Sequence, residues 1–482
     1  MIKKLARDVA VYGLGDLVVK AIAFIQMPVY TKLLLFSPGE IGLWGSVISV
    51  VGLISAFTAL GMDSAYALYF FEKPDIESQR RATSTAIWFT LALTTFVMLV
   101  LSIFSAQLAH HFLDDSRHGW LLLTGIWLVP LQLVHSLGGQ VLRNQMRPRL
   151  FVAFNLLSTI ASVGSGLLIV CSGGGRVQGV LIGAVIALAL MLPVRLWYIR
   201  DLFRPVIDVL LLKKMLAYGL PLVIVALAYW ITGQSSRLVI LKMRGDEESG
   251  LFSTALNLTV VLSLANGAIG QAWSPHAFKA YQESPDRANH FFGRVLTLIL
   301  AGFGLLCVGF CVFGREGLLL LTKPQFLPAE SAILPMALGA YALASTQVTA
   351  IGISIMRQTH YLAWFAWVAA GVFVLVSLWA VPRWGFVGCA WAGCVANSLL
   401  TLIYAAKSRQ LLRIAYQWRR ALLLVGLTVA GCGMARLLPP GISFTNELFK
   451  SGYCLLLAVA LGLVAWIGQA RTNVGTAMEG AR

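Results

Sequence analysis

Long apolar segments without Asp, Glu, Lys or Arg dominate this chain. A helix needs about 20 apolar residues to cross roughly 30 Å of hydrocarbon. Twelve windows have about that length or more: 41–62, 82–113, 118–142, 150–175, 177–194, 215–236, 249–278, 295–314, 331–356, 358–382, 384–406 and 451–470. The pattern therefore predicts a series of membrane-spanning helices.

Two further spans are less regular. The window 421–435 is short and reaches span length if Arg436 extends to the membrane interface. The first span, about 9–34, contains Asp16 and Lys20, and it follows a basic start without a small-residue cleavage site, so we expect a first helix and no removable signal peptide. The prediction is an all-α integral membrane protein with about fourteen transmembrane helices.

The composition agrees with this class of protein. Of 482 residues, 58% are hydrophobic and 12% are charged, whereas soluble domains carry about 25% charged residues. Disordered, disulfide-stapled secreted and cytosolic enzyme classes are therefore poor descriptions. The seven cysteines lie in apolar runs without metal-ligand spacing, so we expect neither a metal site nor a cofactor.

The net charge of +17 is explained mainly by topology. With a cytoplasmic N-terminus, 25 of the 37 Lys and Arg residues fall in cytoplasmic segments and 10 fall outside. This bias follows the positive-inside rule and places both termini in the cytoplasm. Nucleic acid is therefore not an expected partner.

The chain contains a weak internal repeat. Tyr12-Gly13-Leu14 is echoed by Tyr218-Gly219-Leu220, and Gly42-Leu43 by Gly250-Leu251, at offsets of 206 and 208. Between these, Lys32 aligns with Arg237 at an offset of 205. Equivalent elements are six helices apart, so the repeat predicts two parallel six-helix lobes, 1–208 and 209–413, with two added helices in 414–482.

Several motifs together resemble a known family. They are Lys20, Pro28 and Lys32 in the first span, Ser37-Pro38-Gly39-Glu40-Ile41-Gly42-Leu43-Trp44 after it, Leu142-Arg143 with Arg147 and Arg149, and Val381-Pro382-Arg383-Trp384-Gly385-Phe386-Val387-Gly388. The chain resembles the polysaccharide transporters of the multidrug/oligosaccharidyl-lipid/polysaccharide exporter superfamily, which include Wzx-type O-antigen flippases. Where many relatives have Arg, this chain has Lys20, which keeps the charge but loses the bidentate fork.

The resemblance implies a V-shaped bundle in the bacterial inner membrane. Such a protein moves an undecaprenyl-diphosphate-linked oligosaccharide from the cytoplasmic to the periplasmic leaflet by alternating access, for O-antigen or exopolysaccharide synthesis. Its partners would be the lipid-linked oligosaccharide, membrane lipids, a polysaccharide polymerase and a chain-length regulator.

Charged residues within the membrane are the main candidates for substrate binding. Lys20 lies midway along the first span, where a lipid-facing lysine costs at least about 2.5–3.5 kcal/mol, and Asp16 is four residues earlier, in the favourable order for an ion pair. Either the pair only neutralises itself, or Asp16 holds Lys20 until phosphate or a proton displaces it. Arg237 shares a helical face with Gln234 and Trp230, which suits a phosphosugar, although Arg237 can also extend to the interface.

Other polar residues have weaker patterns. Lys32 and Gln271 are further substrate-binding candidates, because Lys32 aligns with Arg237, and Gln271 aligns with Asp63, in the repeat. Asp63, at the end of the second span, is a candidate for the coupling ion or gating, or simply an interfacial carboxylate. Arg143, Arg147 and Arg149 form a candidate cytoplasmic entrance, which topology alone also explains. His135, Gln140, Asn257, Asn266 and Gln347 are intramembrane polar groups that more often join helices than bind ligands.

A flippase is the predicted function, and the protein is not predicted to be an enzyme. The loops are too short for a catalytic domain, and the sequence contains no nucleophile–base set or phosphate-binding loop. The alternatives are a cation-coupled drug or metabolite antiporter of the same superfamily, whose cavity should be smaller and richer in acids, and an integral-membrane glycan polymerase or ligase.

Overall fold

The computed structural model describes residues 15, 18–19, 21–22, 24–72, 75–438 and 444–479, with the side chains of 271–272, 274–275, 444 and 466–479 outside that description. All regular structure in this part of the chain is helical. The chain forms two compact units, Met1–Ser253 and Thr254–Arg482. The lobe boundaries predicted at residues 208 and 413 come from the sequence repeat, whereas the two units are defined by contacts between residues. The lobe boundaries therefore stay a prediction.

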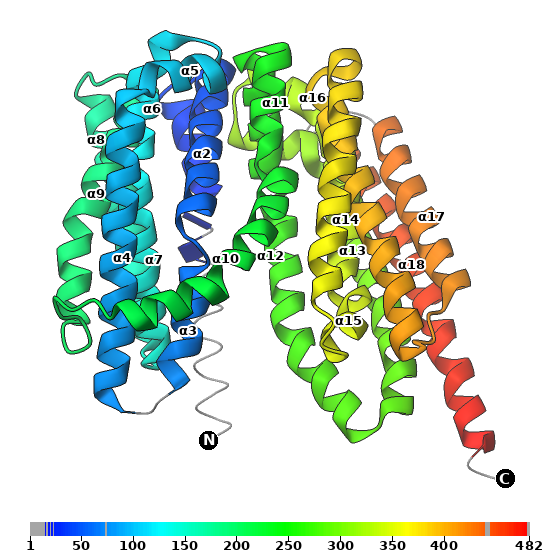
Figure 1. The fold of residues 1–482 in the computed structure, drawn as a ribbon. Helices are drawn as coiled ribbons and strands as arrows, with labels where there is room; N and C mark the ends of the chain where they lie inside the picture. The colour runs from blue at the N-terminus through cyan, green and yellow to red at the C-terminus, as the bar shows by residue number, and fades with distance from the viewer. Residues whose placement is uncertain are drawn as a thin grey trace. The chain divides into compact units, whose positions relative to one another are not determined.

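The first unit contains the helices up to α11 and the start of α12. They are η1 (Val29–Leu33), α2 (Pro38–Thr58), α3 (Met62–Glu72), α4 (Ile76–Ile103), α5 (Ser105–Leu113), η2 (Ser116–His118), α6 (Gly119–Ile126), α7 (Leu128–Asn144), α8 (Pro148–Cys171), α9 (Arg176–Tyr198), α10 (Val209–Gly233) and α11 (Ser235–Arg244). In this unit α8 packs along α9, and α7 packs against α4 and α9 (Figure 1).

The second unit contains the remaining helices. They are α12 (Asp246–Glu283), of which 246–253 belongs to the first unit, α13 (Pro285–Leu321), η3 (Pro324–Ala332), α14 (Ile333–Thr349), α15 (Ile351–Ile355), α16 (His360–Leu412), α17 (Trp418–Met434), η4 (Ala435–Leu437) and α18 (Phe444–Glu479). In this unit α13 packs against α14, α17 and α18 (Figure 1).

The number of spans agrees with the prediction. The described chain has twelve helices that are long and apolar enough to cross a membrane. One of them, α16, has 53 residues, or about 80 Å at 1.5 Å per residue, which is more than two bilayer cores. Its backbone breaks at Gly385, where φ is 58°, so it supplies two spans. With two spans from α16, the described residues contain thirteen spans, and the predicted first span, about 9–34, falls largely outside them.

Large apolar side chains cover the outer surface of the helices. Leu168, Trp364 and Leu375 are 73%, 69% and 69% exposed. Exposed apolar area of this kind is unfavourable in water and suits contact with lipid. Each unit also has its own apolar interior, built around Tyr66 and Phe154 in the first and around Phe292 and Phe303 in the second. The chain is a multi-span membrane protein.

The first turns of α2 and α12 are in backbone contact within the first unit. A Cβ atom added to Gly250 would lie 1.7 Å from the carbonyl oxygen of Pro38, and one added to Gly42 would lie 2.1 Å from that of Asp246. Gly42 and Gly250 are equivalent in the sequence repeat, and the hydroxyls of Ser46 and Ser249 are 3.4 Å apart beside them. Only glycine permits this approach.

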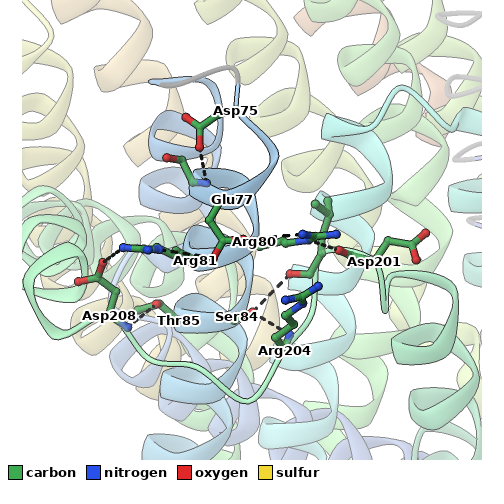
Figure 2. Close-up of polar contacts among 11 residues, drawn as sticks. Asp75, Glu77, Arg80, Arg81, Ser84, Thr85, Asp201, Arg204 and Asp208 are labelled. Carbon is green, nitrogen blue, oxygen red and sulfur yellow. Dashed lines mark hydrogen bonds and ion pairs between the residues drawn. The ribbon is translucent and has the colours of Figure 1, made fainter.

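The connector 199–208, between α9 and α10, is fastened to the first turns of α4. Figure 2 shows the Arg80 Nε donating to the carbonyl oxygen of Asp201 at 2.8 Å, and the backbone N–H of Arg204 donating to the Ser84 hydroxyl at 2.9 Å. Further contacts join Asp208 to Thr85 and Arg81, and Trp88 to Arg204 and Phe203. The start of α10 is therefore held on the first unit.

Candidate functional site

A cavity of about 400 Å³ lies among the helices of the first unit. Its size is within the range of small-ligand sites. Neutral polar groups line much of it, supplied by α7, α8 and the helical segment before η1: Gln26, Gln132, His135, Asn155, Ser158, Thr159 and Ser162. Among its described lining residues there is no Asp, Glu, Lys or Arg. The cavity therefore offers hydrogen bonds without charge at its own surface.

One face of α8 supplies most of these groups. Asn155, Thr159 and Ser162 are spaced four and three residues apart, which places them on one side of a helix. The Thr159 hydroxyl donates to the carbonyl oxygen of Asn155 at 2.8 Å, and the Ser158 hydroxyl donates to that of Phe154 at 2.6 Å. These bonds satisfy each hydroxyl hydrogen within the helix. The lone pairs of the Thr159 oxygen remain as acceptors, whereas the Ser158 oxygen also contacts His135 Nε2 at 3.1 Å.

Aromatic rings form another part of the wall. Tyr30 and Trp44 line the cavity, with their ring centroids 5.5 Å apart in an edge-to-face arrangement. Phe36 stacks behind Tyr30 at 5.3 Å and supports it. Two aromatic rings at right angles, beside amide and hydroxyl groups, suit a ligand that has both apolar and hydroxylated faces.

Arg195 lies behind the cavity, in the last turn of α9, and is 1% exposed. Its Nη1 donates to the carbonyl oxygen of His135, its Nη2 donates to Asn155 Oδ1 at 3.0 Å, and its guanidinium covers the Phe154 ring at 5.1 Å. The apolar window that ends at residue 194 predicts Arg195 in the following loop. In the structure α9 instead continues to Tyr198, and the Arg195 side chain turns into the unit.

Three predicted site residues, Trp230, Gln234 and Arg237, come together where α10 and α11 pack against α2. Arg237 Nη1 donates to Gln234 Oε1 at 2.6 Å, and its side chain packs over Gly45. The Trp230 indole N–H donates to the carbonyl oxygen of Ser49, one turn further along α2, at 3.0 Å. The three do not form one continuous helical face, however, because α10 ends at Gly233 and α11 begins at Ser235.

The predicted entrance residues lie at the end of α7 and the start of α8. Arg143, Arg147 and Arg149 are all exposed. The guanidinium of Arg143 stacks on Phe151 at 5.1 Å, and Phe151 also lines the cavity. Asp63, half-buried in the first turn of α3, is within electrostatic reach of Arg143.

Some predicted residues are not brought to this site. Lys32 is exposed in η1. Asp16 and Lys20, and the side chain of Gln271, lie outside the described residues. Some of the polar groups expected to join helices do so, since Gln347 donates to Asn266 at 3.1 Å and His135 bonds Ser158 at 3.1 Å. Gln140 instead bonds Asn144 and Arg143 within α7. The cavity residues on α8 were missed, although their spacing on one helical face was visible in the sequence.

The second unit contains an apolar groove and a charged pocket. The groove, about 370 Å³, lies between α13 and α18 and is lined by small and aliphatic side chains. The charged pocket, about 180 Å³, contains Lys450 of α18, which is 2% exposed. Its ammonium pairs with Glu316 of α13, and lies 3.7 Å from Glu447. This buried pair ties α18 to α13.

Removing one partner of the Lys450–Glu316 pair should destabilise the protein strongly. Lys450→Met leaves two carboxylates without their cation, which typically costs about 3–5 kcal/mol for a buried pair. The double variant Lys450→Met/Glu316→Gln should recover a large part of the loss. Titration with SDS measures the free energy of unfolding. Glu330→Gln, which breaks a half-exposed pair with Arg315, is the control, with an expected loss of about 1 kcal/mol or less. Equal stability of Lys450→Met and the control would contradict the prediction.

Comparisons with known proteins agree with this architecture. Residues 33–329 match the model of a family described as polysaccharide biosynthesis protein. No curated protein sequence matches the chain. Among solved structures, the fold is similar to that of the lipid II flippase MurJ in an inward closed conformation, with a TM-score of 0.76 and 13% identity, over 95% of this chain and 99% of that chain.

Two further structures share the fold. One is a MOP superfamily transporter from Pyrococcus furiosus, with a TM-score of 0.61 and 13% identity, over 86% of this chain and 96% of that chain. The other is an inward-facing multidrug resistance MATE family transporter of the same superfamily, with a TM-score of 0.57 and 14% identity, over 84% and 95%. Identities this low show a common fold alone. The family match covers more than half of the chain, and it shows that this membrane protein belongs to the polysaccharide biosynthesis protein family, as its sequence motifs indicated.

Proposed function

We propose that the protein is a flippase that moves an undecaprenyl-diphosphate-linked oligosaccharide from the cytoplasmic to the periplasmic leaflet by alternating access. It acts in the bacterial inner membrane with both termini in the cytoplasm, serves O-antigen or exopolysaccharide synthesis, and is not an enzyme. A polysaccharide polymerase and a chain-length regulator are its proposed partners. Family membership supports a role in polysaccharide synthesis.

The cavity of the first unit is the observation that carries this proposal. Hydrocarbon rejects an oligosaccharide because each hydroxyl would lose its hydrogen bonds to water. The cavity replaces them with amide, hydroxyl and imidazole groups, and adds the rings of Tyr30 and Trp44 for the apolar faces of the sugars. A cationic drug would instead require acids, and none is found among the described lining residues. The observation favours the flippase over the antiporter.

The diphosphate needs cations, and we propose Lys20 and Arg237 for this role, with Lys32 as a further contact. Gln234, Trp230 and Gln271 are proposed to bind the sugars, and Asp16 and Asp63 to couple transport to an ion or to gating. Arg143, Arg147 and Arg149 are proposed to receive the headgroup at the cytoplasmic leaflet. Stacking of Arg143 on Phe151 supports this, since the same ring lines the cavity.

Shortening the cavity side chains tests the proposal. In a strain that depends on this protein for glycan export, Gln132→Ala and Trp44→Ala should each reduce export by about tenfold or more, because each loses a directional or stacking contact with the sugar. Surface polysaccharide and lipid-linked glycan remaining at the inner leaflet are measured together. Ser331→Ala, an exposed hydroxyl of the second unit, is the control. Unchanged glycan export in both cavity variants would refute the proposal, and lost drug resistance in its place would favour the antiporter.

A further inference from the structure

The first unit contains a buried cation without a counter-ion. Arg195 is 1% exposed, and no described carboxylate lies within 4.0 Å of it. Its recorded hydrogen bonds go to two neutral acceptors, the His135 carbonyl and Asn155 Oδ1, and its Nε–H is buried without a partner. An unpaired charge away from water is costly, and such residues within membrane proteins are functional candidates by default.

Arg195 fixes the orientation of the Asn155 amide. A guanidinium is donor-only, so it must face the amide oxygen and not the NH₂ group. The amide oxygen is thus occupied at 3.0 Å, and the amide nitrogen donates to no described residue. Because Asn155 lines the cavity and is only half-buried, its amide N–H groups can donate hydrogen bonds to a ligand in the cavity.

The same contact strengthens the amide as a donor. A cation bonded to the oxygen draws electron density from the amide, and hydrogen bonds in such a chain reinforce one another in a low dielectric. The resulting donor is best matched by an anionic oxygen, since charge-assisted hydrogen bonds are the stronger kind. Arg195 itself is not a lining residue, so it acts through Asn155.

We propose that Arg195 is a positioning residue that orients and polarises the Asn155 amide, so that the cavity of the first unit prefers a ligand with an anionic oxygen over a neutral sugar. This inference rests on the proposed function and narrows its substrate class. The anionic oxygen has two sources, a carboxylate on an acidic sugar or a phosphate of the diphosphate linker.

Ligand-observed NMR on the purified full-length protein tests the preference. The probes are glucose, glucuronate and inorganic pyrophosphate, observed by proton or phosphorus resonances. Glucuronate or pyrophosphate should bind about tenfold more tightly than glucose, which is the usual gain of a hydrogen bond to a charged group. Preference for glucuronate alone identifies an acidic sugar as the source, and preference for pyrophosphate alone identifies the linker.

Asn155→Asp is the decisive variant because it should keep the fold. The introduced carboxylate gives Arg195 a counter-ion, yet it presents an anionic oxygen to the cavity in place of the NH₂ group. The preference for anions should therefore disappear in this variant, while the melting temperature is maintained. Arg195→Lys should retain part of the preference, Arg195→Met should lose it, and Ser172→Ala, at the far end of α8, should leave it unchanged.

Two results would overturn the inference: equal affinity of the wild type for all three probes, or a preference that survives in Asn155→Asp. Neither result concerns export, which the Gln132 and Trp44 variants address separately. A flippase that binds neutral sugars equally well would leave the proposed function intact and remove only this inference.

Discussion

A covalent bridge between Ser46→Cys and Ser249→Cys should stop glycan export completely, and a reducing agent should restore it. The two hydroxyls are 3.4 Å apart and buried, where α2 meets the first turn of α12. By the predicted topology this contact is at the periplasmic ends of both helices. Under alternating access the substrate leaves on that side, so the contact must open in every transport cycle. Oxidant, or Hg²⁺ bound between the two thiols, would hold it closed.

Control variants distinguish an effect of the covalent bridge from a loss of activity caused by the cysteine substitutions themselves. Each single cysteine variant should export normally with and without oxidant. Ser377→Cys places a thiol beside the native Cys389 within α16, where the present Oγ···Sγ distance is 3.9 Å, so a bridge there joins parts of one hairpin and should leave export unchanged. Loss of free thiols measures bridge formation. Full export by the bridged Ser46→Cys/Ser249→Cys protein would exclude opening at this contact.

Replacing Arg237 with alanine should reduce export to background while the amount of inserted protein stays normal. The guanidinium is held by Gln234 Oε1 at 2.6 Å and by the Ser253 hydroxyl at 3.2 Å, both neutral acceptors, so its charge remains available for a phosphate. Lys20→Ala should have the same effect if both cations bind the diphosphate. A lost contact between a cation and a phosphate costs about 1.5–3 kcal/mol or more in a site shielded from water.

The lysine variant and a neighbouring cation provide the controls. Arg237→Lys keeps the charge without the planar fork, so export should be intermediate. Lys242→Ala removes an exposed cation from the other end of α11 and should not affect export. Surface polysaccharide is compared with protein abundance in the membrane for each variant. Normal export by both Arg237→Ala and Lys20→Ala would contradict the proposal that these two cations bind the diphosphate.

The sequence was sufficient to predict the helices because each crossing requires the same local property, a long apolar run. It also indicated the break in α16, since Arg383 separates the apolar windows 358–382 and 384–406 and the backbone breaks two residues later, at Gly385. The family followed from motifs around Pro38 and Gly388. These features depend on neighbouring residues, so they could be read without a structure.

The polar interior of the first unit could not be predicted in the same way. Asn155 and His135 are 20 residues apart, and Arg195 is 40 residues beyond Asn155, so their meeting depends on how α7, α8 and α9 pack. The apolar window ends at residue 194, which predicts Arg195 in a loop, whereas α9 continues past it and hydrogen bonds to neutral acceptors hold its side chain inside the unit. A cation at a helix end gives no local sign of whether it faces water or the interior.

The contact of Gly42 with Gly250 also bears on the ancestry of the chain. In an isologous dimer, a residue touches its own copy only at the two-fold axis. Gly42 and Gly250 are copies of one position in the repeat, and their backbones touch. If the ancestor was a dimer of two identical single-repeat chains, its two-fold axis would therefore have passed through this contact. The same glycine of each chain would have met its own copy there. Fusion of the two genes would have freed each side to change separately, as Gly39 and its copy Glu247, three residues before the two glycines, now illustrate.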